Sequence, residues 1–333
     1  MSTARSGCEW TRRQFLGTLS LAAIAASCGP PKYDRAGFDV PAQSEVALLP
    51  VSDYGAGAVD AITRGIELLR PPVRGRRVLL KPNIVEYESG AMVNTNPVVI
   101  AGAIEAFRRA GAREIVVGEG PGHRRDTEYL LAASGLSAYL RELRVPFVDL
   151  NVDDVRPVQL RSRFMGRDSL MLPVEVLKSD VVVSMAKLKT HHWAGMTAAM
   201  KNLCGIVPGA IYGWPKNVLH FSGIDSSIVD LNATIRPGFA IVDAIVAMEG
   251  DGPIMGTPRK CGFLAMGTDP VAVDATCARI MGLEPRKLPY LRHASEYFGN
   301  LSPSRIAQRG EDPARYETSF ELIDRLKPLR HLV

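Results

Sequence analysis

The run Asp180-Val-Val-Val-Ser-Met-Ala186 leads directly into Lys187-Leu-Lys-Thr-His-His-Trp193. An apolar run without alternation predicts a strand that is buried on both faces, as in a parallel sheet. The polar segment behind it holds two adjacent histidines, and Lys201 and His220 follow. Because open α/β sheets bind ligands beyond the carboxyl ends of their strands, this order predicts a functional site at the end of this strand.

Strand-like and helix-like segments alternate on both sides of that run. Asn96-Pro97 and Asp269-Pro270 are expected helix starts, since a side-chain cap followed by proline suits the first turn. We expect strands at 45–51, 77–81, 114–118, 146–150, 180–185, 239–248 and 262–266, helices at 58–69, 97–110, from 126, at 226–235 and 270–281, a short helix between 196 and 203, and a hairpin or irregular connection at 156–173. The alternation predicts an α/β fold with largely parallel sheets, arranged as two Rossmann-like lobes (45–155 and 170–333) with a cleft between them.

The N-terminus has the features of an export signal. Thr11-Arg-Arg-Gln-Phe-Leu-Gly17 matches a twin-arginine motif, and the apolar stretch 16–27 is too short to span a membrane as a stable helix. Ala25-Ala-Ser-Cys28 resembles a lipoprotein cleavage box in which Cys28 is acylated. We therefore expect a signal peptide at 1–28, a tether at 29–44, and a domain at 45–333 that is periplasmic or anchored to the membrane by the lipid.

The export signal has an alternative processing site and implies a partner. The alternative to lipidation is cleavage after Ala26, which gives a soluble periplasmic product. The twin-arginine machinery is an expected partner, and because it carries folded proteins, an inserted cofactor becomes a stronger expectation than for other exported chains.

Composition excludes some kinds of site. The net charge is +5, and the basic residues are scattered without interleaved aromatics, so we do not expect nucleic-acid binding. If Cys8 leaves with the signal peptide and Cys28 is acylated, Cys204, Cys261 and Cys277 remain, without a C-x-x-C pair. We therefore do not expect an iron–sulfur cluster, and we expect the last two cysteines to be small buried hydrophobes.

Three histidine positions are candidates for proton transfer or metal binding. The segment 118–123 (Gly-Glu-Gly-Pro-Gly-His) joins a predicted strand to a helix, and the alternative to a site there is a plain glycine turn. Its last residue, His123, would project from the strand end. Adjacent loop residues point in different directions, so we expect at most one of His191 and His192 to line a pocket with His220. Their spacing is not a zinc signature such as H-E-x-x-H.

Lysines and carboxylates supply further candidates. Lys201 lies among small residues, where it would act as an electrostatic clamp or an attachment point; the alternative is a solvated surface lysine. Lys81-Pro-Asn83 ends a strand and would supply a cation to the pocket. Asp243, Glu249 and Asp251 lie at another strand end, where carboxylates bind metals or act as acid and base. The alternative for them is a polar glycine turn.

Together these segments resemble the domain of unknown function family 362. The matching pieces are Lys81-Pro-Asn83, Asn94-Thr-Asn-Pro97, Gly118-Glu-Gly120, Lys187-x-Lys-Thr-His191, Lys201-Asn-Leu-x-Gly205, Glu249-Gly-x-Gly-Pro253 and Asp269-Pro-Val-Ala-Val-Asp274. They recur in order over roughly 45–282, which makes the match specific. Membership in this family implies no particular activity.

The chain also resembles lactate racemase and its relatives. The likeness rests on the glycine-rich loop ending in His123, on His191-His-Trp-Ala-Gly195, on Lys201 with Pro208-Gly209, and on His220. This resemblance implies a nickel-pincer nucleotide attached to Lys201, with His220 as the nickel ligand. It also implies that His123 and His191 move protons at a substrate carbon. Asn202 and the residues behind it differ from that group.

These observations lead to one main expectation about function. We expect an exported enzyme that acts on a small hydroxy acid or a related anion by proton or hydride transfer, with a bound cofactor. The expected cofactor contacts are Lys81, Asn83, Lys189 and Asn202. The alternatives are a non-catalytic periplasmic binding protein for a small anion or metal, and a structural lipoprotein whose histidines are incidental.

Overall fold

The computed structural model describes residues 37–122 and 126–331. Its strands are β1 (Ser44–Pro50), β2 (Arg77–Lys81), β3 (Glu114–Glu119), β4 (Phe147–Asp149), β5 (Val155–Gln159), β6 (Ser169–Pro173), β7 (Val181–His191), β8 (Gly195–Thr197), β9 (Phe239–Glu249), β10 (Thr257–Gly267) and β11 (Ile306–Gly310). Its α-helices are α2 (Ala56–Leu69), α3 (Pro97–Arg109), α4 (Thr127–Ala133), α5 (Leu136–Glu142), α6 (Val174–Lys178), α7 (Ala199–Asn202), α8 (Gly209–Tyr212), α9 (Asn217–Phe221), α10 (Ile224–Ile235), α11 (Pro270–Ile280) and α12 (Pro289–Ser295).

One mixed sheet of nine strands forms the centre of the molecule. The strand order is β11-β1-β10-β9-β7-β2-β3-β4, and β8 pairs with the end of β7. The run β9-β7-β2-β3-β4 is parallel, whereas β10 is antiparallel to both of its neighbours. The predicted α/β class and the largely parallel sheet are confirmed. Because β7 pairs with β2 on one side and β9 on the other, strands of both expected lobes share this one sheet instead of forming two.

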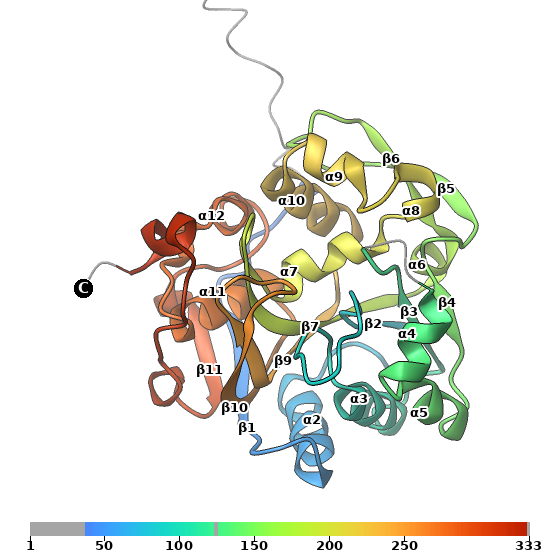
Figure 1. Ribbon diagram of the computed structural model, residues 1–333, viewed down its shortest axis with the longest axis horizontal. Coiled ribbons are helices and arrows are strands. Elements are labelled where there is room, and N and C mark those ends of the chain that lie inside the picture. Colours follow the sequence, from blue (N-terminus) through green and yellow to red (C-terminus); the bar gives the residue numbers. More distant parts are fainter. Residues whose placement is uncertain (1–36, 123–125, 332–333) are drawn as a thin grey trace, which may run out of the picture.

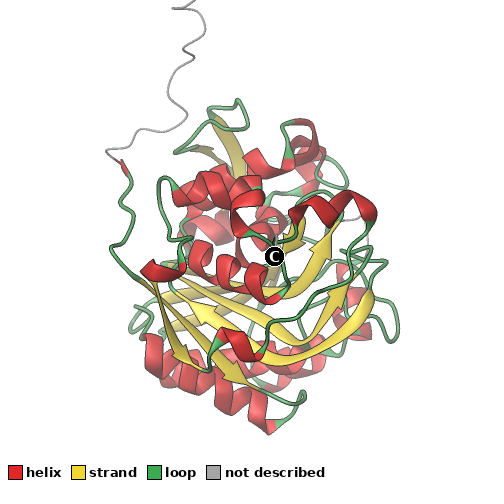
Figure 2. Cartoon of the chain, turned by 90° about the vertical axis from the view of Figure 1, so that its left-hand side faces the viewer, coloured by secondary structure: helices red, strands yellow, loops and turns green. Residues whose placement is uncertain are grey.

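Helices cover both faces of the sheet, as Figures 1 and 2 show. Alternate residues of β1 enter different cores: Val46 and Leu48 pack with α7, α10 and α11, whereas Ala47 and Leu49 pack with α2 and α3. This division follows from the two-residue period of a strand. The sheet therefore separates two apolar layers, and its carboxyl-terminal edge is left to the connecting segments.

Most of the expected elements are found within one or two residues of their predicted ends. Asn96 accepts from the Val98 amide at 2.9 Å, and Asp269 accepts from the Val271 amide at 2.9 Å, so both predicted helix starts are confirmed. The connection at 156–173 contains the antiparallel hairpin β5–β6.

The largest difference lies at the site. β7 extends to His191 instead of ending near 185, because its last residues pair with β8. Met196, which was expected on the short helix, belongs to β8. Two antiparallel strands thus carry the lysine- and histidine-rich segment to the sheet edge.

The predicted signal peptide and Cys28 lie outside the described residues. No helix in the described parts of the chain combines the length and apolar character that crossing a bilayer requires.

Candidate functional site

A cavity of about 470 Å³ opens where the predicted site lies, beyond the ends of β2, β3 and β7 and beside the loop after β9. A cavity at this position is expected for an open α/β sheet, because the parallel strands all end at one edge. Its charged and imidazole side chains are Lys81, Glu86, Glu119, Lys189, His191, His192, Lys201, Lys216, His220 and Asp251.

A fully buried ion pair supports one wall of the cavity. The Nζ atom of Lys81 donates to Oε2 of Glu119 at 2.8 Å and to Oδ1 of Asn202 at 2.9 Å. The Asn202 amide in turn donates to the Lys81 carbonyl at 3.0 Å. Burial lowers the pKa of Lys81, and the adjacent Glu119 carboxylate opposes this effect. The Lys81 and Glu119 charges therefore neutralise each other within this pair.

Two glycines of the sequence motifs are explained by this wall. A Cβ atom at Gly205 would collide with the Lys81 and Glu119 side chains, and one at Gly120 would lie 2.7 Å from the Gly205 carbonyl oxygen. Contacts this short are not found for real Cβ atoms, so a larger residue at either position would force the neighbouring atoms of this wall apart. These glycines permit close packing at this wall.

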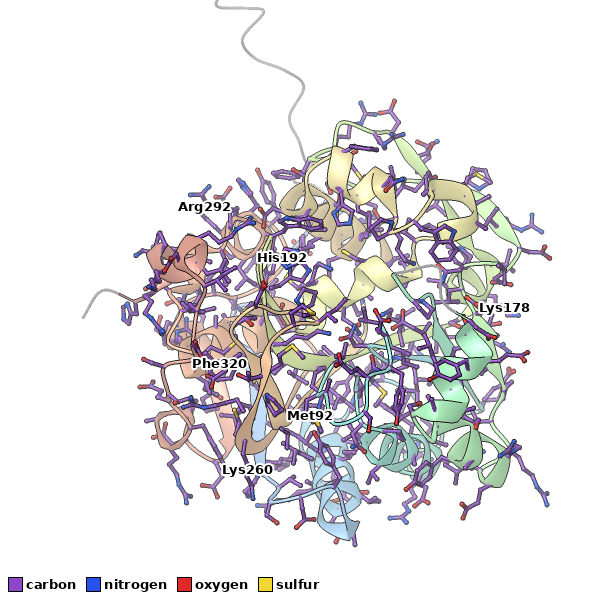
Figure 3. The ribbon with its side chains drawn as sticks, viewed as in Figure 1. Met92, Lys178, His192, Lys260, Arg292 and Phe320 are labelled. Atoms are coloured by element: carbon purple, nitrogen blue, oxygen red, sulfur yellow. The ribbon has the colours of Figure 1, made fainter. Side chains whose placement is uncertain are left out.

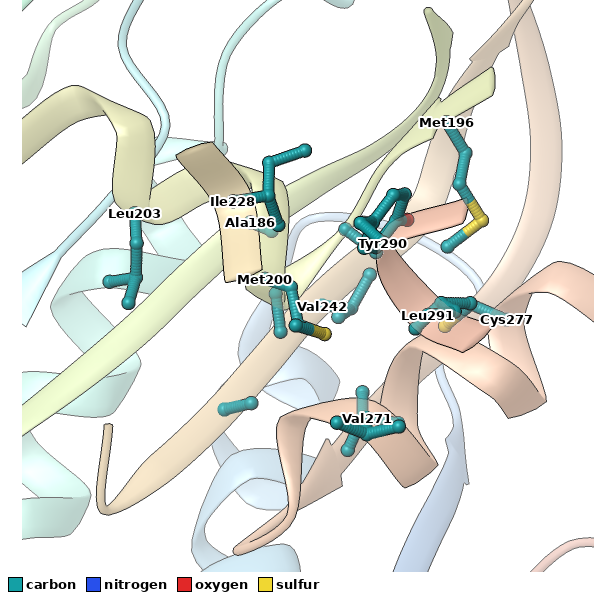
Figure 4. Packing of buried hydrophobic residues seen from close by; sticks show 14 of the residues in the cluster. Ala186, Met196, Met200, Leu203, Ile228, Val242, Val271, Cys277, Tyr290 and Leu291 are labelled. Carbon is teal, nitrogen blue, oxygen red and sulfur yellow. The ribbon is translucent and has the colours of Figure 1, made fainter. Parts of the chain in front are cut away.

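The short helix α7 is held from several sides. Asp274 on α11 accepts from the amides of Ala199 and Met200 at 2.7 and 3.1 Å, and Ser184 donates to the Ala199 carbonyl at 2.7 Å. Burial raises the pKa of Asp274 to about 8, while these two amides oppose the rise. Met200 and its neighbour Leu203 pack among side chains from other elements, as Figure 4 shows. These contacts fix the backbone that carries Lys201.

Lys201 is partly buried and lines the cavity. Within the described residues, the side-chain amine of Lys201 has no hydrogen bond or ion pair. Its charge lowers the pKa values of His191, Lys189 and His220, so it lies close to all three. The site therefore contains an amine whose charge no described carboxylate offsets.

Lys189 is a second lysine without an acidic partner. Only 1% of its surface is exposed, and its Nζ atom donates to the Val93 carbonyl at 2.7 Å. Burial, followed by the charges of Lys201 and Lys187, lowers its pKa well below the ordinary value. The Glu119 carboxylate opposes this lowering only in part, and an anion beside the amine would offset more of the desolvation cost.

Lys216 is a third buried amine, which the sequence did not single out. It precedes α9 with a φ of 66°, and its Nζ atom donates to Oδ1 of Asn151 at 3.0 Å and to the carbonyls of Gly205 and Val207. Three acceptors suit an ammonium group, whereas burial lowers its pKa to about 7. No sequence pattern marks this lysine, because its partners come from two segments far apart in the chain, around Asn151 and around 205–207.

His191 is held in one tautomer. Its Nδ1 atom accepts from the amides of Trp193 and Ala194 at 3.1 and 3.3 Å, so the neutral ring carries its proton on Nε2. Burial and the charge of Lys201 lower its pKa well below 6.5. In this arrangement His191 is a hydrogen-bond donor, and it has no free lone pair with which to accept a proton or bind a metal.

In the other two histidines, one ring nitrogen faces a backbone carbonyl instead of backbone amides. Nδ1 of His192 lies 2.9 Å from the Gly252 carbonyl, and Nε2 of His220 lies 3.1 Å from the Pro215 carbonyl. Because a carbonyl only accepts, each ring keeps a lone pair on its second nitrogen. Burial and the charge of Lys201 lower the pKa of His220.

Trp193 joins the histidines into one cluster. Its ring centroid lies 4.7 Å from that of His192 and 4.6 Å from that of His220, both edge to face. Figure 3 shows His192 on the side of the molecule that holds α7. The expectation that only one of His191 and His192 lines the pocket with His220 is wrong, because the tight turn between β7 and β8 turns both rings toward it.

Two buried polar atoms at the cavity lack partners. Oδ1 of Asn83 and Oγ1 of Thr197 have no hydrogen bond, although only 8% and 3% of these residues is exposed. A buried polar atom without a partner carries a free-energy cost that a bound ligand or water removes. These two atoms indicate where such a ligand would be bound.

The three candidate carboxylates do not form one site. Asp243 is buried against Lys187, Glu249 pairs with Arg259, and the exposed Asp251 lines the cavity. Across residues 37–122 and 126–331, no three histidine, cysteine or carboxylate groups form a metal-binding set. His123 lies outside the described residues.

The structure thus brings together Lys81, Asn83, Lys189, His191, Lys201, Asn202 and His220 around one cavity. Sequence reasoning missed Lys216, Asp274, Thr197 and Met255. Asp274 stands in the sequence only as the last residue of a family-matching segment, and its hydrogen bonds to α7 are seen only in three dimensions.

Comparison with known proteins identifies the family. The chain belongs to the family described as "Domain of unknown function (DUF362)", which matches residues 78–279. A relative, the "Thylakoid-associated protein sll1697" of Synechocystis sp. (strain ATCC 27184 / PCC 6803 / Kazusa), is 30% identical over 273 residues. The match covers 78% of this chain and 80% of the relative.

Two solved structures are also similar. The lactate racemase apoprotein from Thermoanaerobacterium thermosaccharolyticum matches with a TM-score of 0.45 and 13% identity, over 73% of this chain and 59% of that chain. A protein from Thermotoga maritima matches with a TM-score of 0.39 and 12% identity, over 72% and 59%. The chain thus spans less than two thirds of either structure.

Proposed function

We propose that this DUF362 protein is an enzyme that binds a small hydroxy acid or related carboxylate in the cavity and moves a proton on it. The observation that carries the proposal is the pair of amines, Lys189 and Lys201, which face one cavity and have no carboxylate partner within the described residues. Amines that are buried or partly buried without a counter-ion favour an anionic ligand, because the ligand offsets their desolvation.

The site provides a division of roles among its donors. The two amines would bind the carboxylate of the ligand, and the Nε2–H group of His191 would donate to its hydroxyl or carbonyl oxygen. A neutral imidazole that donates a hydrogen bond polarises such an oxygen without adding a charge to the site. Thr197 and Asn83 offer the remaining polar contacts.

Proton transfer requires a group that can accept a proton. His220 meets this need, since its Nδ1 atom keeps a lone pair and its lowered pKa leaves the ring neutral near pH 7. His123, which the sequence places at the end of β3, remains a proposed second acid/base group. In this scheme His191 is catalytic as a donor and not as a base.

The residues also fit the cofactor that the sequence resemblance implies. With that cofactor bound, the Lys201 amine would serve for attachment and the Nδ1 atom of His220 would bind the metal. The ligand's carboxylate would then lie on Lys189 alone, and His123 would take over the acid/base role. The cofactor would supply the electron-accepting centre of the reaction. Lys81 and Asn202, which bind each other, would shape the wall beside it, and Lys189 and Asn83 would contact it directly.

One observation favours a non-catalytic binding protein as the second candidate. The Nδ1 atom of His191 is occupied by two backbone amides, so the most deeply buried ring of the site is not a base. A site that only binds an anion needs donors and cations alone. The two candidates therefore differ in whether the α-hydrogen of a bound hydroxy acid exchanges.

The test combines binding with exchange. Calorimetry with lactate should show binding to the full-length protein, a loss of at least about tenfold in affinity for Lys201→Met, and no change for Lys260→Met. Lys260 is exposed on β10 and lies well away from His192 in Figure 3, so this variant removes the same charge elsewhere. Absence of binding, or equal affinity in the two variants, would refute the anion site.

Incubation in D₂O then separates enzyme from binding protein. Proton NMR should show loss of the α-hydrogen signal of lactate with the wild type and not with His220→Gln. Intact mass and metal analysis of the same sample, compared with Lys201→Ala, detect an attached cofactor. Lactate that binds and never exchanges, in a preparation shown to be fully loaded or shown to need no cofactor, supports the binding protein.

We also propose export and membrane association. The twin-arginine motif and Cys28 support the former, and the name of the thylakoid-associated relative supports the latter. Cell fractionation of the wild type and of Cys28→Ser tests a lipid anchor: release of both proteins into the soluble fraction would rule it out.

A further inference from the structure

The mouth of the cavity is apolar, in contrast to its floor. Trp193 and Met255 both line the cavity, yet 48% and 75% of their surfaces are exposed. Ile254, Ile224 and Leu219 continue the apolar wall beside them. Large exposed apolar side chains that gather at one opening, unlike single scattered ones, indicate a binding surface.

Burial orders the site by depth. The polar floor is formed by Lys189 and His191, which are 1% and 5% exposed, and by Thr197 at 3%, whose hydroxyl has no partner within the described residues. The apolar residues Trp193 and Met255 lie toward solvent. A ligand that fills this cavity therefore meets cations and hydrogen-bond donors with its inner end, and apolar side chains with its outer end.

The volume of the cavity exceeds the needs of a small acid. About 470 Å³ corresponds to the space of roughly 15 liquid water molecules at ~30 Å³ each. A three-carbon hydroxy acid has six non-hydrogen atoms, so it would leave much of the cavity to water. Water against the Trp193 and Met255 side chains is unfavourable compared with an apolar group of the ligand.

The rim has the character of an adaptable apolar contact. The Trp193 ring packs its edge or face against His192 and His220, which holds it in place while nearly half of its surface stays open. Met255, on the loop between β9 and β10, has a flexible and polarisable side chain that accommodates apolar groups of different shape.

We propose that the natural ligand is an amphipathic organic acid, whose carboxylate lies on the Lys189 and Lys201 floor and whose apolar group of about six carbons lies against Trp193 and Met255. This inference rests on the proposed function, because it assumes the anion site. It adds a requirement that the anion site alone does not make: affinity must rise when an apolar group is attached to the same acid.

Three probes with shared parts test the requirement on the full-length protein. Lactate carries the hydroxy acid alone, 3-phenyllactate adds a phenyl ring to it, and 2-phenylethanol carries the ring without a carboxylate. We expect 3-phenyllactate to bind at least about tenfold more tightly than lactate, and 2-phenylethanol to bind more weakly than either acid.

Variants at the rim test whether Trp193 and Met255 cause the higher affinity for 3-phenyllactate. Met255→Ala and Trp193→Ala should each reduce the ratio of the two acid affinities at least about threefold. Phe221→Ala is the matched control, since Phe221 is 87% exposed but is not part of the cavity lining, and its ratio should equal that of the wild type. All three positions are exposed, so these variants should fold.

The outcomes separate the two proposals. Equal affinities for lactate and 3-phenyllactate, or a preference that survives in the Trp193→Ala/Met255→Ala double variant, would overturn the amphipathic ligand and leave the anion site intact. If neither acid binds, the anion site itself is wrong. Tight binding of 2-phenylethanol would show that the apolar rim acts without the charged floor and would also overturn the inference.

Discussion

Two buried lysines stand two residues apart on β7 and have opposite surroundings. The Nζ atom of Lys187 donates to Oδ2 of Asp243 at 2.7 Å, to the Tyr54 hydroxyl at 2.8 Å and to the Val246 carbonyl at 3.0 Å. That of Lys189 donates to the Val93 carbonyl, its one partner within the described residues. The first lysine belongs to a saturated network (Tyr54, Lys187 and Asp243), and the second faces a cavity.

The neighbouring strand produces this difference. β9 places Asp243 opposite Lys187, but the pairing shifts between the two lysines and places Met248 opposite Lys189. A buried charge with a hydrogen-bonded counter-ion supports the fold, whereas a buried charge without one is available to a ligand at a cost in stability. Two lysines with nearly equal burial thus have different surroundings, and the proposed binding role falls to the one without an ion-pair partner among the described residues.

The largest effect is expected from breaking the saturated network. Asp243→Ala leaves the Lys187 amine buried without a counter-ion, and the free energy of unfolding should fall by about 3–5 kcal/mol. Urea unfolding followed by circular dichroism measures the change. The double variant Lys187→Met/Asp243→Leu removes both charges and should recover most of the loss; a loss below about 1 kcal/mol in the single variant would show that the network does not support the fold.

The same kind of change at the second lysine should affect binding instead. Lys189→Met removes a charge that lacks a counter-ion but also leaves the Val93 carbonyl without its donor, so the free energy of unfolding should stay within about 1 kcal/mol of the wild type. Lactate affinity, measured by calorimetry, should fall about 10- to 100-fold. Unchanged affinity together with a large loss of stability would reverse the contrast between the two lysines.

The last effect concerns the pH dependence of stability, which the buried amine beside the cavity should produce. Burial lowers the pKa of Lys216 from the ordinary value of 10.5 to about 7. Between these values the unfolded chain binds a proton that the folded chain does not, so this lysine makes stability rise with pH from about 7 to 10. Below pH 7 both states are protonated, and the cost of burial is fully present.

Lys216→Met removes this contribution. The stability of the variant relative to the wild type should therefore decrease between pH 7 and 10, by up to about 1.4 kcal/mol per pH unit. Thermal or urea unfolding across this pH range measures it, with Lys260→Met as the exposed control. Parallel curves for Lys216→Met and the wild type would mean that its three oxygen partners keep the amine charged throughout.

Much of the site could be predicted from the sequence because its residues lie next to strand ends. Lys81 ends β2, Lys189 and His191 end β7, and Lys201 follows within a short helix. The expectation for the two adjacent histidines failed because their positions depend on contacts with another strand. The turn that brings both His191 and His192 to the cavity depends on pairing with β8.

The sequence by itself determined the α/β class, the helix starts at Asn96 and Asp269, and the strands that deliver lysines and histidines to one edge. Periodicity and capping are properties of neighbouring residues, so they can be read along the chain. Only the tertiary structure decided the protonation pattern of the histidines and the partners of the lysines. These depend on strand register and on burial, which place Asp243 beside Lys187 and leave Lys189 without any carboxylate in the described parts of the chain.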